Sequence, residues 1–292
     1  MDNRTEVRAF LASRRAKITP EQAGLDSHGA RRVPGLRRAE VAQLAGVSVE
    51  YYTRMERGTL AGVSETVLGA VARALQLDES ERVYLFDLAR AAGGQDRARQ
   101  QRRPPRQEVR PSVQRLLDSM GEIPAFVRNG RLDVLASNAL LRALYVDAFD
   151  TTKRPVNLAR FVFLDPRAHL LHPDWSASAD TSVSILRTEA GRNPYDKALT
   201  DLVGELSTRS EEFRTRWAAH DVRLHRSGTK HFHHRAVGDL HLAFDALELP
   251  GDAALTLTAY SAEPDTPDAD NLSLLATWAA TQLPADQAST ST

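Results

Sequence analysis

Apolar residues recur at helical spacing through the first third of the chain. This pattern predicts helices over residues 5–16, 64–75 and 79–92. Thr19-Pro20-Glu21 is typical of the cap and first turn of a further short helix. The front of the chain is therefore expected to form an all-α domain of five or six helices that ends near residue 94.

Residues 35–58 predict two helices joined by a tight turn. Gly46 ends the first helix, because glycine enters the left-handed conformation without steric cost. Ser48 is a suitable N-cap for the second helix, on which Tyr52 and Met55 fall on the buried side. This combination is typical of the DNA-binding helix-turn-helix, whose second helix enters the major groove.

The exposed side of the second helix carries groups that can read DNA. Arginine binds guanine or phosphate, Glu50 can accept a hydrogen bond from cytosine, and Val49 can contact a thymine methyl group. Cations at the start of the first helix can reach the DNA backbone beside the groove. The alternative is a helical hairpin whose charged face is simply solvated. The candidate DNA contacts are Arg37, Arg38, Ser48, Val49, Glu50, Tyr51, Thr53, Arg54 and Arg57.

The rear of the chain mixes strand and helix patterns. Asn129-Gly130 between two apolar runs, residues 125–127 and 132–136, is a strong hairpin signal. Further helices are expected at 113–120, 138–145, 180–190, 195–207 and 210–217, and strands at 221–225, 231–237, 240–249 and 256–262. This order predicts an α+β domain, with helices that cup a sheet around an internal cavity.

A stretch without apolar periodicity separates the two parts. It is rich in arginine and ends in Pro104-Pro105, so it is expected to be a basic linker that could add phosphate contacts. The expected domains are residues 1–94 for DNA binding, 95–108 as linker, 109–283 for ligand binding and dimerisation, and 284–292 as a disordered tail.

Charge separates the same two parts, although the 292-residue chain has no net charge. Residues 1–106 hold 19 Lys and Arg against 13 Asp and Glu, a balance of +6, and the remainder hold 19 against 25, a balance of −6. A basic front and an acidic rear suit a DNA reader followed by a domain that does not touch DNA. The chain has no cysteine, which excludes disulfides and cysteine-ligated zinc. We expect a cytoplasmic protein with no membrane partner, because no apolar run or signal peptide is visible.

Several motifs resemble a known family of transcriptional regulators. Gly35-Leu36-Arg37-Arg38, residues 41–48 and residues 51–56 are similar to the XRE-type (lambda-repressor-like) helix-turn-helix. Residues 124–127, 135–138, 220–222 and 230–233, with Phe213 and Trp217, resemble the MmyB-like ligand-binding domain. The resemblance implies a PAS-like sensor fold, dimeric binding to a double-stranded operator, and a small apolar, fatty-acid-like effector. Ala39, Ser137 and Arg235 depart from the family pattern.

The rear aromatic residues are core candidates first, but together they could line an apolar site with a few polar groups. The alternative for His220 is a positioned polar group, but the resemblance favours it as a pocket wall or ligand contact. The candidate ligand-binding residues are Phe126, Asn138, Phe161, Phe163, Trp175, Phe213, Trp217 and His220.

Six of the nine histidines lie between His220 and His241, and His231 and His233 are expected on one face of a strand. Their spacing matches no metal motif, so we expect no metal and no cofactor apart from the effector.

Three functions remain open. The chain is expected to be a ligand-responsive regulator and not an enzyme, because no nucleophile–base pair or phosphate loop is visible. The alternatives are a constitutive DNA-binding protein whose rear domain only dimerises or docks a protein, and an enzyme with an accessory helix-turn-helix.

Overall fold

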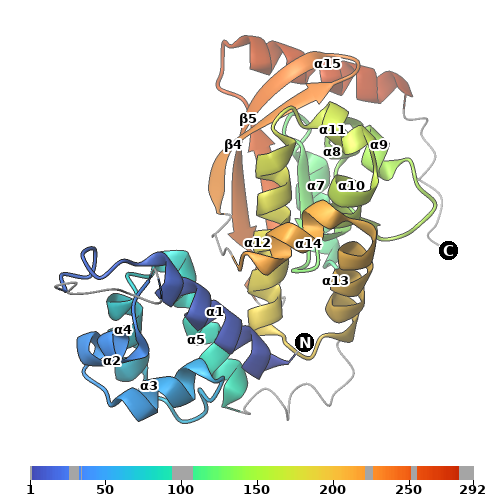
Figure 1. Cartoon of the computed structure of the whole chain (residues 1–292). Coiled ribbons are helices and arrows are strands. Elements are labelled where there is room, and N and C mark those ends of the chain that lie inside the picture. Colours follow the sequence, from blue (N-terminus) through green and yellow to red (C-terminus); the bar gives the residue numbers. More distant parts are fainter. Residues whose placement is uncertain are drawn as a thin grey trace. The chain divides into compact units, whose positions relative to one another are not determined.

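The computed structural model describes residues 2–25, 33, 35–93, 108–220, 226–250 and 255–282. Its contacts divide the chain into two compact units, each of which is described by itself (Figure 1). Unit 1 comprises Met1–Pro105 and Leu186–Leu224, and unit 2 comprises Arg106–Ile185 and His225–Thr292. Part of the rear sequence thus packs with the front, whereas the boundaries at residues 94, 108 and 283 stay predictions.

The front of unit 1 is all-helical, as predicted. A cluster of buried aliphatic and aromatic side chains joins its helices, with Phe10 and Tyr84 edge to face at 5.1 Å between ring centroids. The helices are α1 (Asn3–Lys17), α2 (Arg38–Ala45), α3 (Val49–Glu56), α4 (Glu65–Ala74) and α5 (Glu79–Ala92).

The prediction of a short helix after Thr19 is wrong, because residues 20–24 form only a turn. The Thr19 hydroxyl accepts from the backbone N–H of Gln22 at 3.3 Å, and the Gln22 amide oxygen accepts from the N–H of Thr19 at 2.9 Å. These reciprocal bonds cap the start of the turn, and Gly24, in the left-handed conformation with φ 70°, ends it.

Three helices from the rear sequence complete unit 1. They are the end of α12 (Trp175–Arg192), α13 (Lys197–Arg209) and α14 (Glu211–Ala218), which correspond to three predicted helices. Gly191 allows α12 to approach α5 closely, because a Cβ atom there would lie 2.4 Å from the Tyr84 ring. Any larger residue would force the Tyr84 ring or one of the helices to shift.

A buried arginine holds these helices to α1. The Arg187 side chain has no exposed surface, and its guanidinium contacts the Glu6 carboxylate and the Trp217 carbonyl oxygen. It also lies 2.8 Å from His220 Nδ1 and 4.1 Å from the Trp217 ring centroid. The Tyr84 hydroxyl donates to the same Glu6 carboxylate at 2.6 Å. We call these five residues the Arg187 cluster.

Unit 2 contains an antiparallel sheet in the order β3-β2-β1-β6-β5-β4, which confirms the predicted α+β class (Figure 1). The first strand in the sequence, β1, pairs with the last, β6, so the middle of the sheet joins distant parts of the sequence. The strands are β1 (Ala125–Arg128), β2 (Asp133–Ser137), β3 (Val156–Asn157), β4 (Ser227–His234), β5 (Gly238–Glu248) and β6 (Thr256–Ser261). The strand predicted at residues 221–225 lies outside the described residues.

Helices surround this sheet. Helix α7 (Pro111–Ser119) covers one face with an apolar cluster that includes Val127 and Leu257. On the other face, α11 packs against β4 and α8 against β1. The remaining helices of unit 2 are α8 (Ala139–Leu144), α9 (Val146–Phe149), α10 (Leu158–Leu164), α11 (Arg167–Leu171), the start of α12, and α15 (Pro267–Gln282).

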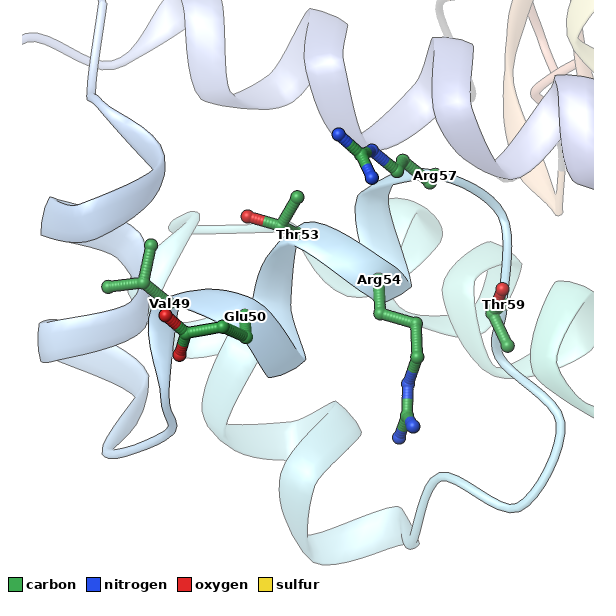
Figure 2. A pocket seen from close by; sticks show the side chains of 6 residues that line it. All are labelled: Val49, Glu50, Thr53, Arg54, Arg57 and Thr59. Atoms are coloured by element: carbon green, nitrogen blue, oxygen red, sulfur yellow. The ribbon is translucent and has the colours of Figure 1, made fainter.

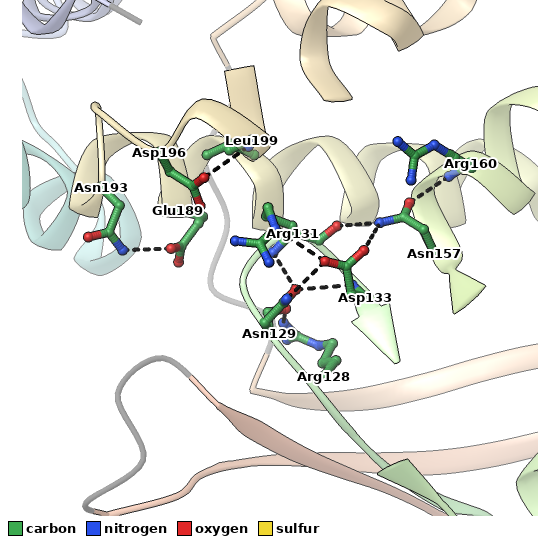
Figure 3. Close-up of polar contacts among 10 residues, drawn as sticks. All are labelled: Arg128, Asn129, Arg131, Asp133, Asn157, Arg160, Glu189, Asn193, Asp196 and Leu199. Carbon is green, nitrogen blue, oxygen red and sulfur yellow. Dashed lines mark hydrogen bonds and ion pairs between the residues drawn. The ribbon is translucent and has the colours of Figure 1, made fainter. Parts of the chain in front are cut away.

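The predicted hairpin between β1 and β2 is confirmed, and the Asn129 side chain organises its turn (Figure 3). The Asn129 Oδ1 atom accepts from the backbone N–H groups of Arg131 and Asp133, at 2.9 and 3.0 Å. Its amide nitrogen donates to the Asp133 carboxylate, which also accepts from Asn157 Nδ2 at 2.8 Å. The Asn129 side chain therefore braces the turn, and Asp133 joins the hairpin to β3.

Replacing Glu6 with Gln should lower the free energy of unfolding by about 3 kcal/mol at neutral pH. Burial alone would raise the pKa of Glu6, but contacts with His220, Arg187 and Tyr84 outweigh it and lower the pKa from 4.5 to about 2. Because the pKa of Glu6 is lower in the folded protein, its ionised carboxylate contributes its full stabilisation of the fold above pH 4.5. This contribution is lost as the pH falls towards 2.

Urea unfolding between pH 7 and pH 2.5 measures this contribution, with Glu50→Gln on the exposed side of α3 as the control. The difference between wild type and Glu6→Gln should shrink across the acid range. A difference that stays constant down to pH 2.5 would contradict the ionised role of Glu6.

Candidate nucleic-acid interface and ligand site

The turn between α2 and α3 has the geometry expected of a helix-turn-helix. Gly46 adopts the left-handed conformation with φ 66°, and the N–H of Val47 donates to the Ala42 carbonyl oxygen at 3.0 Å. The Ser48 hydroxyl accepts from the N–H of Tyr51 at 3.0 Å, which confirms Ser48 as the N-cap of α3. The turn therefore fixes the direction in which α3 leaves α2.

Buried groups on the inner side of α3 hold it in place. Tyr52 and Met55 are fully buried, as predicted. Glu56 is buried as well, and its carboxylate binds the guanidinium groups of Arg15 and Arg38 at 2.9–3.0 Å. Burial raises the pKa of Glu56, but these two arginines outweigh burial and lower it. The carboxylate therefore stays ionised and ties α3 to α1 and α2.

The outer side of α3 forms a shallow hollow of about 320 Å³ (Figure 2). The Arg54 guanidinium lies 5.0 Å from the ring centroid of Tyr51, so this arginine is held over an aromatic face rather than by a carboxylate. The hollow is lined by Val49, Glu50, Thr53, Arg54, Arg57 and Thr59. The structure thus brings together five of the nine predicted DNA contacts, and Thr59 joins them.

The other predicted DNA contacts lie around this face. Arg37 is exposed at the start of α2, where its backbone N–H donates to Glu40 at 2.6 Å. Arg38 is half-exposed, but its guanidinium is bound to Glu56. A DNA contact from Arg38 would have to share that guanidinium. The basic linker and the pair Arg31 and Arg32 lie outside the described residues.

The predicted ligand-binding residues are divided between the units. Phe126 and Phe161 are buried in unit 2, on the face of the sheet that α8 and α11 cover. Phe163 and Trp175 form a separate, half-buried pair, and Trp175 stacks on His169 at 4.4 Å. Phe213, Trp217 and His220 belong to unit 1, where Trp217 and His220 contact Arg187. Whether any of them binds a ligand stays a prediction.

Asn138 has a structural task. Its Oδ1 atom accepts from the N–H groups of Ala125 and Leu141, at 3.2 and 2.9 Å. Its amide group donates to the carbonyl oxygens of Met120 and Ile123, at 2.8 and 2.6 Å. These bonds use both lone pairs and both hydrogens of the amide, so none is left to orient a ligand.

A cluster of rings fills the space between the sheet and the helices α8 and α11. Its ring centroids lie 5.3–6.5 Å apart, and the Tyr145 and Tyr260 hydroxyl groups are 3.2 Å from each other. Lys230 donates to the Tyr145 hydroxyl at 3.1 Å. We call Tyr145, Phe161, His172, Phe232 and Tyr260 the inner aromatic cluster.

Of this cluster, only Phe161 is among the ligand-binding residues predicted from the sequence. The alternation of side chains along β4 could have identified two further residues, because every second side chain of a strand points to the same face. His231 and His233 share the outer face, as predicted, and both approach Asp239 Oδ1, at 3.2 and 2.7 Å. Lys230 and Phe232 must then point inwards. Nothing in the sequence brings His172 or Tyr145 to the same place, because that depends on how the helices cross the sheet.

The described residues offer no group of three or more histidine, aspartate or glutamate side chains arranged to hold a metal ion. Over the same residues, no helix combines the length and the apolar character that crossing a membrane requires.

Comparison with known proteins identifies two domains, the second of which includes residues 186–224 of unit 1. Residues 109–275 match the model of the MmyB-like transcription regulator ligand binding domain, and residues 7–85 match a helix-turn-helix domain model. No curated protein matches the chain. The helix-turn-helix and ligand-binding domains are those of a transcription regulator.

Arg54→Ala should weaken binding to a specific operator by about 1–3 kcal/mol if Arg54 makes a bidentate contact with a base. Fluorescence anisotropy with an operator selected from random DNA measures this loss. Arg8→Ala, an exposed arginine on α1, removes the same charge as the control. An equal loss on operator and scrambled DNA would show that Arg54 contacts only phosphate.

Proposed function

Because the chain belongs to the regulators with an MmyB-like ligand-binding domain, we propose that it binds its operator as a homodimer under the control of a small, mostly apolar, fatty-acid-like effector. The helix-turn-helix is of the XRE type, and unit 2 is a PAS-like sensor in this proposal. The chain acts by binding and has no catalytic task.

The observation that carries the DNA-binding part is the outer face of α3. It presents the exposed side chains of Arg54, Arg57 and Glu50 around one hollow, while Glu56 and its two arginines hold the inner face (Figure 2). A rigid helix with base-reading groups on one side is what readout in the major groove requires. One helix of this length reads only a few base pairs, which supports two copies on a two-part operator.

The inner aromatic cluster supports an effector site in unit 2. Its rings bury a large apolar area between the sheet and helices α8, α10 and α11, and phenolic hydroxyl groups lie among them. An apolar surface with a few polar groups is usual for small-molecule sites. The antiparallel sheet, flanked by helices, also supports the PAS-like assignment.

Helix α12 is one continuous helix that belongs to both units, so it can transmit a movement from the effector site to the DNA-binding helices. It begins three residues after His172, and its residues up to Ile185 belong to unit 2. The residues from Leu186 onwards belong to unit 1, where Arg187 is bound to Glu6 on α1. We propose that effector binding shifts α12 and thereby α1. An effector can do so only if its affinity differs between the two arrangements.

Selection from random DNA with the full chain should yield an inverted repeat whose half-sites are about 10 base pairs apart, centre to centre. Saturating decanoate should then change the affinity for this operator by about 5–150-fold. Anisotropy titrations measure the affinity, and analytical ultracentrifugation of the complex should give two chains per operator.

The outcomes separate the alternatives. Failure to enrich any motif would contradict the DNA-binding proposal. An enriched inverted repeat whose affinity responds to neither decanoate nor the small molecules released from the denatured protein would favour the constitutive alternative, in which the rear domain only dimerises or docks a protein.

A further inference from the structure

Lys230 carries a partly buried positive charge that no carboxylate compensates in the described part of the chain. Its side chain lies on the inner face of β4, with Nζ 5.3 Å from the Phe232 ring centroid and 5.7 Å from that of Tyr145. One N–H donates to the Tyr145 hydroxyl. Burial lowers the pKa of Lys230 to about 8, so the ammonium is still mostly charged at neutral pH. A buried ammonium in this position is costly unless an anion accompanies it.

His172 is a second unsatisfied group in the same place. The residue is 1 % exposed, and neither ring nitrogen has a hydrogen-bond partner within the described residues. Its ring lies between Tyr145, at 5.9 Å, and Phe232, at 5.4 Å. Burial, and then the charge of Lys230, hold the pKa of His172 well below its usual range. The imidazole is therefore neutral and keeps one N–H to donate.

The tyrosine pair leaves a third donor. The Tyr145 oxygen accepts from Lys230, and the Tyr145 and Tyr260 hydroxyl groups lie 3.2 Å apart, where either can donate to the other. The pair shares one hydrogen bond, so one of its two hydroxyl hydrogens remains for another acceptor, and it belongs to Tyr260 when Tyr145 donates. An ammonium, an imidazole and a phenol thus lie around the same rings, and each has a donor to spare.

We propose that Lys230, His172 and Tyr260 bind the carboxylate of an effector whose apolar body lies against the inner aromatic cluster. Tyr145 is a positioning residue, which holds Lys230 and orients Tyr260. This inference rests on the proposed function, because it specifies the head group of the effector of unit 2. Arg187 provides the contrast within the chain: it is fully buried, but Glu6 supplies its counter-charge and no anion from outside is needed.

The test compares probes that share one apolar body, namely decanoate, decan-1-ol and methyl decanoate, by calorimetry on the full chain. Wild type should bind decanoate at least about tenfold more tightly than decan-1-ol. Lys230→Met should remove this preference, and Lys230→Arg should retain part of it. Lys153→Met, which removes an exposed charge in unit 2, should leave the preference unchanged.

A second readout follows the charge directly. The chain has only four lysines, Lys17, Lys153, Lys197 and Lys230, so ¹³C-methylated lysines give few NMR signals. The Lys230 signal should titrate near pH 8 and shift upwards by about one pH unit with decanoate but not with decan-1-ol. This measurement also shows that the modified chain is folded.

Each outcome decides between two claims. Equal binding of decanoate and decan-1-ol by wild type would overturn the carboxylate site and leave the apolar effector of the proposed function intact. Unchanged decanoate binding by Lys230→Met would overturn the role of Lys230. If wild type binds none of the three probes, both the head-group inference and the fatty-acid-like effector are wrong, whereas operator binding is unaffected.

Discussion

The charge of Arg187 constrains the whole of unit 1. A guanidinium with no exposed surface must find acceptors inside the protein, because an isolated buried charge is far too costly. Glu6 on α1 and the carbonyl oxygen of Trp217 on α14 provide them. The end of α12, the end of α14 and the first helix therefore meet at one point. If either ion-pair partner moves, the other is left buried without compensation, so these elements are expected to move together or not at all.

The two units treat a buried cation in opposite ways. In unit 1, the Arg187 cluster and the pair of arginines around Glu56 are both matched by carboxylates on neighbouring helices. Such groups fix geometry, and α3 needs fixed geometry in order to present Arg54. In unit 2, Lys230 has a phenol and two aromatic rings instead of a carboxylate. That difference separates a structural charge from one that is suited to a ligand.

Much of the local structure could be predicted from the sequence. The Gly46 turn, the Ser48 cap, the hairpin at Asn129 and most helices follow from contacts within a few residues, and the structure confirms them. Arg187 reads as an ordinary helical arginine, and only a partner 181 residues away makes it structural. Asn138 was expected near a ligand for its polarity, but its place before α8 makes it a cap. Side chains gathered by the crossing of distant elements, such as His172 and Tyr145, leave no such local trace.

Helix α12 relates these two environments. Its start follows His172, whose ring belongs to the inner aromatic cluster, and its end carries Arg187. A helix is stiff along its axis, so a displacement at one end reaches the other unless the helix bends. Because interfaces built on buried ion pairs have few alternative arrangements, a small shift of α12 either leaves the Arg187 cluster intact or moves α1 with it. Since Arg15 on α1 binds Glu56 on α3, such a movement would reach the helix that faces the DNA.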